Sequence, residues 1–163
     1  MTQLSHRLIQ SSLLEAQNIL AQFIQNPQTV ETMVEVAQRI QSVFEKRGRV
    51  FVCGNGGSMC DAMHFAEELS GRFREDRKPL PAICISDPSH ITCVANDYGY
   101  DNWVSEAIKA YTQKNDMLIL ISSSGISKNI VNAAKHCHEE NIPLITLSGF
   151  NEDNSLSKLG NIN

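Results

Sequence analysis

Several common signals are missing from this sequence of 163 residues. It contains no uninterrupted run of Lys and Arg, and its 14 basic and 18 acidic side chains give a formal net charge of −4. We therefore do not expect nucleic-acid binding, which needs a basic surface to contact the phosphate backbone. No apolar stretch approaches the roughly 18 residues that span a membrane. The N-terminus also lacks the apolar core of a secretory signal.

Paired cysteines are missing as well. The five cysteines are odd in number, and no two of them are spaced as CxxC. Free, buried thiols are favoured over a disulfide framework or a cysteine zinc site. We therefore expect a protein of the reducing cytoplasm. The nucleotide-binding patterns GxxxxGK[ST] and GxGxxG are absent, so neither a P-loop nor a dinucleotide site is predicted.

Two amphipathic helices are predicted before any strand. The first carries a narrow apolar stripe with steps of three and four residues, which consists of Ile9, Leu13, Ala16, Leu20 and Phe23. Asn26 and Pro27 then start a second helix, as its N-cap and first helical residue. That helix ends near Gly48, which suits a left-handed C-terminal position. We expect residues 1–48 to be an oligomerisation arm whose stripe is buried by the remaining domain or by another subunit.

Four short runs rich in Val and Ile follow the helices, at residues 49–53, 81–86, 116–122 and 143–148. Each run predicts a strand that is buried on both faces. Helical patterns separate the runs, over residues 58–70, 102–111 and 128–140. This alternation predicts an α/β fold for residues 49–163, with helices flanking a parallel sheet.

The first predicted strand ends in a glycine-rich segment, Gly54-Asn55-Gly56-Gly57-Ser58, which we call the GNGGS turn. Ligands of open parallel sheets bind beyond the carboxyl ends of the strands, and glycine lets the backbone approach a ligand closely. Ser58 is expected to cap the helix that follows, with Asp61 completing a capping box. A tight turn without a ligand is an equal alternative for this segment alone.

The third predicted strand ends in SSSGIS, residues 122–127, which we call the serine loop. Its hydroxyls and main-chain N–H groups meet at a helix N-terminus, where the helix dipole favours an anion. We expect phosphate binding by the four serines of the loop, which are Ser122, Ser123, Ser124 and Ser127. In the alternative interpretation, Ser127 only caps the helix and the other serines are solvated.

The helix after the GNGGS turn carries His64 and Glu68, whose spacing of four places them on one face. The pair is able to share a metal ion or to place a carboxylate beside an imidazole; an ordinary surface pair is the alternative. Glu67 is expected to point about 100° away from this face. Asn96 and Asp97 form a further hydrogen-bonding pair, which we predict in a polar turn.

The segments CGNGGSMCDAMHFAEELSGR, ANDYGY and ISSSGIS together resemble the phosphoheptose isomerases of the sugar isomerase (SIS) superfamily. The resemblance implies an SIS-type sheet of five parallel strands and a cytoplasmic homotetramer with the N-terminal helices in its interfaces. It implies the interconversion of sedoheptulose 7-phosphate and D-glycero-D-manno-heptose 7-phosphate through an enediol, the first step of ADP-heptose synthesis for the lipopolysaccharide core. A non-catalytic SIS-domain sugar-phosphate sensor and an SIS-fold protein that binds a replication initiator are the alternatives.

The resemblance also assigns roles to single residues. His64 and Glu68 match zinc ligands, and Glu68 matches a catalytic acid/base residue. Substrate contacts match Asn55, Gly56, Gly57, Ser58, Glu68, Asn96, Asp97, Ser122, Ser123, Ser124 and Ser127. Arg72 matches an arginine near the site, whereas Ile126 stands where the family usually has Asn.

The family's site also uses a segment beyond the position of Asn163. A glutamine and a histidine of an R-I-Q-E-x-H-like motif are expected there as the two remaining ligands of one zinc ion per subunit, and the histidine as the second acid/base group. Two interpretations follow: a longer protein with a complete site, or a chain ending at Asn163 with half of it. In the second case we expect weak zinc binding and little turnover, and His90 is the first substitute to test.

Overall fold

The computed structural model describes residues 2–150 and 153–163, which form two compact units. The first unit reaches to Gln38, and the second comprises Arg39–Asn163. The first unit contains α1 (Thr2–Gln25) and the beginning of α2 (Pro27–Glu45). The main-chain N–H of Gln28 donates to Asn26 Oδ1 at 3.1 Å, so Asn26 caps α2 as predicted.

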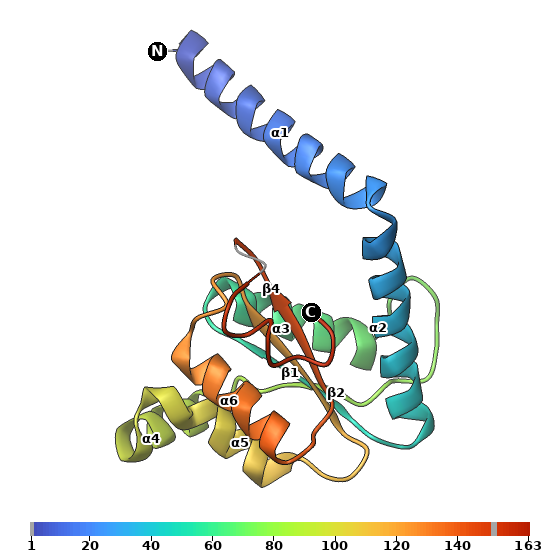
Figure 1. Ribbon diagram of the computed structural model, residues 1–163, viewed down its shortest axis with the longest axis vertical. Helices are drawn as coiled ribbons and strands as arrows, with labels where there is room; N and C mark the ends of the chain where they lie inside the picture. The colour runs from blue at the N-terminus through green and yellow to red at the C-terminus, as the bar shows by residue number, and fades with distance from the viewer. Residues whose placement is uncertain (1, 151–152) are drawn as a thin grey trace. The chain divides into compact units, whose positions relative to one another are not determined.

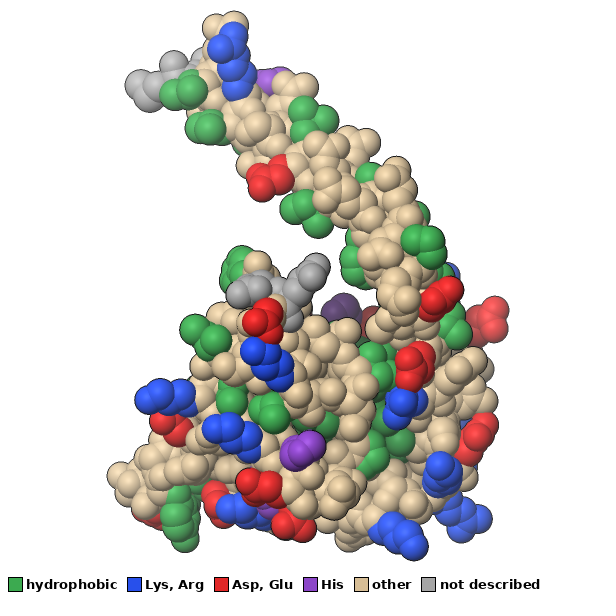
Figure 2. Space-filling view, in the orientation of Figure 1, with side chains coloured by type: hydrophobic (Ala, Val, Ile, Leu, Met, Phe, Trp, Pro, Cys, Tyr) green, Lys and Arg blue, Asp and Glu red, His purple; other side chains and the backbone are tan. Residues whose placement is uncertain are grey.

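The apolar stripe of α1 lies on the surface of its unit. Ile9, Leu13, Leu20 and Phe23 are each between 50% and 67% exposed, and Figure 2 shows apolar side chains along this helix. Nothing in the described part of the first unit covers the stripe. Although α1 is 24 residues long, none of the described helices is apolar enough over a sufficient length to cross a membrane.

The end of α2 differs from the prediction. The residue with left-handed backbone is Arg47, at φ 59°, and not Gly48. The N–H of Gly48 donates to the carbonyl of Val43 at 2.8 Å, which closes the helix. A Cβ on Gly48 would lie 2.0 Å from the carbonyl oxygen of Asn115. Glycine is therefore required here for close packing of two backbone segments.

The second unit contains a parallel sheet of four strands, β1 (Val50–Gly54), β2 (Ala82–Cys84), β3 (Met117–Ser122) and β4 (Leu144–Ser148). Their order is β2-β1-β3-β4, which confirms the predicted α/β fold. The prediction that every strand is buried on both faces is wrong for β2, a short edge strand in which Ile83 is 43% exposed. Beside the outer edge of β4, Ile162 forms a single parallel bridge with Ile145, where the family resemblance implies a fifth strand.

Helices cover both faces of the sheet (Figure 1). They are α3 (Gly57–Ser70), α4 (Pro88–Tyr98), α5 (Trp103–Tyr111) and α6 (Lys128–Glu139), with a short 3-10 helix, η1 (Tyr100–Asn102), between α4 and α5. On one face, α3 packs on β1 and β2. On the other face, Leu118 and Leu120 of β3 share a buried cluster with Trp103 and Ile108 of α5 and with apolar residues of α6. This cluster is the main core.

The structure contains a helix, α4, where the sequence predicts a polar turn. Asn96 and Asp97 therefore lie in a helix near its end. Asp87 caps α4 by accepting a hydrogen bond from the His90 N–H at 2.7 Å, and Pro88 occupies the first helical position. Hydrogen bonds from the Ser89 hydroxyl and then from the His90 N–H lower the pKa of the Asp87 carboxyl. These N-terminal signals are stronger than the weak apolar pattern that follows them.

All five cysteines are free thiols, as predicted. Cys53 and Cys137 are buried, and desolvation raises the pKa of Cys137 to about 12 and that of Cys53 further above its ordinary value. Cys84 is half-buried. The expectation of burial is wrong for Cys60 and Cys93, which are exposed on the surfaces of α3 and α4.

Candidate functional site

The order of the strands places the candidate site between β1 and β3. From β1 the chain crosses to β2 on one side, and from β3 it crosses to β4 on the other side. The two connections therefore leave the neighbouring carboxyl ends of β1 and β3 in opposite directions, which is where open parallel sheets bind ligands. Gly54 pairs with Ile121, so the GNGGS turn and the serine loop begin next to each other.

The GNGGS turn brings the chain from β1 into α3 within three residues. A Cβ on Gly54 would lie 2.6 Å from the Ser58 carbonyl oxygen, and Gly56 has a φ of 54°. The helix begins at Gly57 with Gly56 as its N-cap and without a side-chain capping bond. The prediction that Ser58 caps α3 with Asp61 is thus wrong, because the turn at Gly56 starts the helix earlier. The Ser58 hydroxyl is not used as a cap.

The serine loop has a hydrogen-bonded interior. Ser122 is buried; its hydroxyl donates to Ser127 Oγ at 3.3 Å and accepts from the Gly125 N–H at 3.2 Å. Ser124 and Ser127 are half-buried, and Ser123 is exposed. The loop therefore presents three serines at its surface and uses the fourth to hold its shape.

The serine loop ends at the N-terminus of α6. No described side chain caps the main-chain N–H groups at this helix end. Ser127 is the N-cap residue, but its side chain makes no capping hydrogen bond. The alternative that Ser127 serves only as a cap is therefore not supported. Within the described residues, the main-chain N–H groups of Ser127, Lys128 and Asn129 have no acceptor. Together with the helix dipole they form a suitable receptor for an anion.

The segment after β4 supports the serine loop from outside. The Gly149 N–H donates to the Ser123 carbonyl at 3.1 Å, and the Leu156 N–H donates to the Gly125 carbonyl at 3.0 Å. The nearly buried Asn154 lies against Gly125, where a Cβ would come within 2.0 Å of Asn154 Oδ1. These contacts hold the loop in one shape without a ligand. Sequence reasoning missed Asn154, because a contact between residues so distant in the chain leaves no local pattern.

Two asparagines join the GNGGS turn to the first turn of α6, which directly follows the serine loop. Asn55 Nδ2 donates to Asn129 Oδ1 at 2.9 Å, and Asn129 Nδ2 donates to Asn55 Oδ1 at 2.8 Å. The Tyr100 hydroxyl donates to the same Asn55 oxygen at 3.3 Å. Asn129 and Tyr100 were not predicted as site residues, and only their nearness to the serine loop and to Asn96-Asp97 in sequence pointed to them.

His64 and Glu68 lie on one face of α3, as predicted, with His64 Nε2 and Glu68 Oε1 3.0 Å apart. The His64 side chain is 74% exposed and that of Glu68 34%. The expectation that Glu67 points away is wrong: ligand atoms of His64, Glu67 and Glu68 all lie within 4.8 Å of one another. Residues three apart are also helical neighbours, so Glu67 is able to reach His64. The guanidinium of Arg77 donates to the Glu68 carbonyl at 2.5 Å, which secures this last turn of α3.

The other predicted residues lie on α4 and just after α3. Asn96 Nδ2 donates to Asp97 Oδ1 at 2.8 Å, and both side chains are exposed on α4. No hydrogen bond among the described residues joins either of them to the loops. Arg72 is exposed just after α3. His90 Nε2 lies 2.9 Å from the Trp103 carbonyl oxygen, so this side chain connects α4 to α5.

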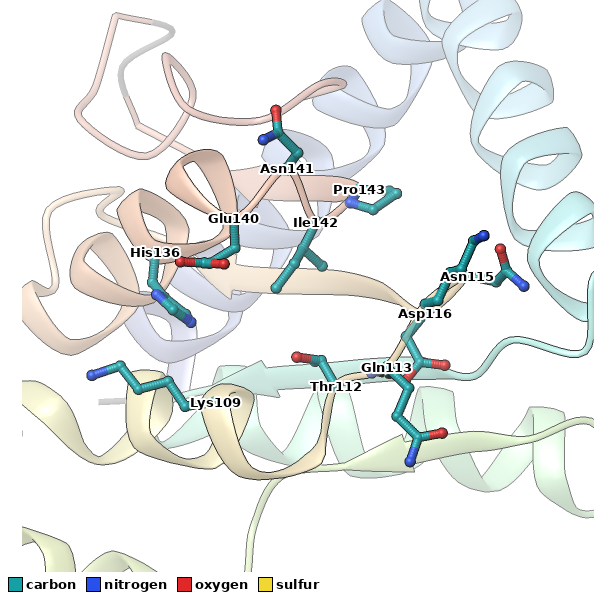
Figure 3. A pocket seen from close by; sticks show the side chains of 11 residues that line it. Lys109, Thr112, Gln113, Asn115, Asp116, His136, Glu140, Asn141, Ile142 and Pro143 are labelled. Atoms are coloured by element: carbon teal, nitrogen blue, oxygen red, sulfur yellow. Dashed lines mark hydrogen bonds between the residues drawn. The ribbon is translucent and has the colours of Figure 1, made fainter.

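A depression of about 750 Å³ lies at the other end of the strands, beside the segments that lead into the amino ends of β3 and β4 (Figure 3). Its lining includes Asp116 and none of the predicted site residues. The Asp116 carboxylate is already occupied, because it accepts hydrogen bonds from Arg49 Nη2 at 2.7 Å and from the Gln113 N–H at 2.8 Å. The buried carboxylate of this depression is therefore already paired, whereas, within the described part of the chain, the N–H groups at the start of α6 are not.

Known proteins with similar sequences are phosphoheptose isomerases. That of Histophilus somni is 48% identical over 141 residues, which cover 86% of this chain and 72% of the relative. That of Cytophaga hutchinsonii is 47% identical over 139 residues, which cover 85% of this chain and 73% of the relative.

Solved structures with a similar fold include a phosphoheptose isomerase. The phosphoheptose isomerase of Francisella tularensis is 31% identical with a TM-score of 0.88, and the match covers 96% of this chain and 81% of that one. The Vibrio vulnificus NanR protein complexed with ManNAc-6P shares only the fold, at 16% identity and a TM-score of 0.60 over 95% of this chain and 49% of that one. The SIS domain family matches residues 12–149. The chain belongs to the SIS domain family and, within it, to the phosphoheptose isomerases.

Proposed function

We propose that this isomerase interconverts sedoheptulose 7-phosphate and D-glycero-D-manno-heptose 7-phosphate through an enediol, as the first step of ADP-heptose synthesis for the lipopolysaccharide core. The observation that carries this proposal is the uncapped serine loop beside the GNGGS turn, between β1 and β3. The names of the similar proteins support the substrate class. Phosphate binding at one loop would leave the sugar next to the other.

The serine loop would hold the phosphate group. Ser123, Ser124 and Ser127 face the surface, and Ser122 keeps the loop in shape from below. The N–H groups at the start of α6 would complete the site. Binding energy from the phosphate, which does not react, would position the sugar for the chemical step.

The sugar would lie along the GNGGS turn and α3. In this arrangement Asn55, Gly56, Gly57 and Ser58 contact its hydroxyl groups. Asn96 and Asp97 would close over it from α4, since the chain just after α4 reaches Asn55 through Tyr100. Both side chains are exposed on α4, so they are free to contact a sugar.

Proton transfer between adjacent carbons would be the task of Glu68. An aldose–ketose isomerisation moves one proton between adjacent carbons through an enediol, while a second proton leaves the hydroxyl oxygen that becomes the new carbonyl and another is taken up by the oxygen of the old carbonyl. The Glu68 carboxylate would accept the first proton and deliver it to the second carbon. It is half-buried and oriented by His64 at 3.0 Å, so it is held in place but open to a substrate.

The same face of α3 suits a zinc ion. His64 supplies a ring nitrogen and Glu68 a carboxylate oxygen, with a Glu67 oxygen within the same 4.8 Å, and these are donor types that zinc accepts. A zinc ion held by His64 and Glu68 would supply positive charge near the substrate oxygens. Arg77 would contribute by holding the turn that carries Glu68.

The exposed stripe of α1 supports an assembly of several chains. We propose a cytoplasmic homotetramer in which residues 1–48 form the oligomerisation arm and residues 49–163 the sugar-phosphate-binding domain. A continuous apolar surface of this kind is unusual on a monomer. Light scattering at micromolar concentration should give a mass well above 18.1 kDa, and a monomer would contradict the assembly.

The experiment that tests the proposed function is the substitution Glu68→Gln. It removes the proton-accepting group without changing the size of the side chain. Turnover of sedoheptulose 7-phosphate, followed by NMR, should fall by about 10²–10⁴-fold, whereas its affinity in calorimetry should stay within a few-fold. Glu75→Gln, at an exposed position after α3, is the matched control.

Two outcomes would count against the isomerase mechanism. Undiminished turnover in the Glu68→Gln protein would show that another residue moves the proton. Binding of sedoheptulose 7-phosphate without any turnover in a protein that includes the acid/base histidine expected beyond Asn163 would favour the sugar-phosphate sensor.

A further inference from the structure

A single buried side chain connects the two loops of the proposed site. Asn129 stands in the first turn of α6, directly after the serine loop, and is only 2% exposed. Both polar atoms of its amide are directed at Asn55 of the GNGGS turn, at 2.9 and 2.8 Å. The two residues are 74 positions apart in the chain. A buried polar side chain that satisfies both its atoms on one partner determines how that partner is oriented.

We propose that Asn129 is a positioning residue, which orients the Asn55 amide toward the sugar and couples sugar binding to the phosphate-binding loop. This inference rests on the proposed function, because it concerns how the same site selects a heptose phosphate. Asn129 touches no substrate with its side chain in this scheme; it acts through Asn55.

The argument follows from the hydrogen bonds of the Asn55 amide. Its oxygen accepts from Asn129 Nδ2 and from the Tyr100 hydroxyl, and one of its two N–H groups donates to Asn129 Oδ1. The second N–H of Asn55 is left for a ligand. Turning the Asn55 amide alone by half a turn would place oxygen against oxygen and nitrogen against nitrogen, which loses both bonds of the pair, so the two amides are able to turn only together. Asn129 thus holds the Asn55 amide in its place and plane, and in the arrangement seen, with the Tyr100 hydroxyl donating to the Asn55 oxygen, Asn55 presents a donor that suits an oxygen acceptor such as a carbonyl or a hydroxyl group.

The position of Asn129 in the chain explains the coupling. Its main-chain N–H belongs to the group at the start of α6 that faces the proposed phosphate. Its side chain holds the turn that faces the proposed sugar. The pairing of β1 with β3 brings the two ends of the site together, and Asn129 adds a direct side-chain link between them. Loss of the side chain should affect sugar recognition while leaving the serine loop intact, because the loop has its own contacts with Gly149, Asn154 and Leu156.

The test compares two ligands by calorimetry. Asn129→Leu keeps the approximate size of the side chain but removes its polar atoms. Asn129→Ala removes the whole amide group. Affinity for sedoheptulose 7-phosphate should fall about tenfold in both, as expected for lost hydrogen bonds to a buried group, whereas affinity for inorganic phosphate should stay within about twofold. Asn132→Ala is the matched control, because Asn132 lies on the same helix and bonds to the Asp101 carbonyl instead of to Asn55.

A double variant separates positioning from general damage. If Asn129 acts through Asn55, Asn55→Ala combined with Asn129→Ala should bind sedoheptulose 7-phosphate no more weakly than Asn55→Ala alone. Tyr100→Phe removes the exposed hydroxyl that donates to the same Asn55 oxygen, and it is available even if the buried variants do not fold. It should weaken binding of sedoheptulose 7-phosphate about threefold and leave binding of inorganic phosphate unchanged.

The inference is overturned if the variants weaken both ligands by the same factor, or if the effects of the two asparagine substitutions multiply. Either result would make Asn129 a purely structural residue and leave the proposed function standing. If the unmodified protein binds inorganic phosphate but not sedoheptulose 7-phosphate, the proposed function fails and the inference fails with it.

Discussion

Gly125→Ala tests whether the serine loop has the rigid, supported shape described above. Gly125 has a φ of 65°, which disfavours alanine by about 1–2 kcal/mol. The added Cβ would also lie 2.0 Å from Asn154 Oδ1 and 2.1 Å from its Cγ, so the Asn154 side chain must move. That oxygen accepts hydrogen bonds from the Leu156 and Ser157 N–H groups, and Asn154 Nδ2 donates to Ser148 Oγ, each at 2.9 Å.

The expected loss combines these effects. Losing three hydrogen bonds at about 0.5–1.5 kcal/mol each, together with about 1–2 kcal/mol of backbone strain, gives a decrease of about 2.5–6.5 kcal/mol in the free energy of unfolding, centred on about 4 kcal/mol. Urea denaturation followed by circular dichroism measures it as a midpoint shift of about 2 M, taking a slope of about 2 kcal/mol per M. Gly57→Ala is the control: no atom lies within 4 Å of its added Cβ and its φ is not left-handed, so stability should change by less than about 1 kcal/mol. A decrease below about 1 kcal/mol for Gly125→Ala would refute the claim that Asn154 and Gly125 lock the loop.

Three further outcomes are expected. Ser124→Ala combined with Ser127→Ala should lower the affinity for inorganic phosphate about tenfold or more in calorimetry, at about 1 kcal/mol per lost hydrogen bond. Unchanged affinity would reject the serine loop as the phosphate receptor. At pH 8 a maleimide should label Cys60 within minutes but leave Cys137, a buried thiol with its pKa raised to about 12, unlabelled until urea is added; mass spectrometry of the peptides decides this. Hydrogen bonds lower the pKa of the Asp87 carboxyl in the folded protein, so its stabilisation of α4 should be present at neutral pH and disappear as the pH falls below the ordinary aspartate range. The Tm of the Asp87→Ala protein should therefore lie below that of the unmodified protein at neutral pH and approach it only in acid.

The parts of the fold that were predicted well are those governed by local pattern. The strands β1, β3 and β4 begin and end within one residue of the predicted runs, because buried parallel strands need unbroken Val and Ile. The edge strand β2 and helix α4 were predicted poorly. An edge strand is covered on fewer sides, and α4 depends on the cap at Asp87 more than on an apolar stripe.

The candidate site shows the same division. His64 and Glu68 share a helix face, which their spacing alone predicts. Asn129 and Asn154 could not be found in this way, because their partners lie on other segments and are reached only when the sheet has formed. Gly48 illustrates a third case: the glycine was noticed, but its reason is the backbone of Asn115 and not the helix end.

The pairing of β1 with β3 also has a consequence for the order of folding. β3, α6 and β4 are consecutive in the chain, and Ser122 pairs with Ser148 only 26 residues later. Gly54 must find Ile121, 67 residues away, which closes a longer loop and is slower to form. We expect the β3-α6-β4 unit to condense first and β1 to dock onto it later. A refolding chain would then acquire its affinity for a simple anion before its selectivity for a sugar, since the serine loop belongs to the early unit and Asn55 arrives with β1.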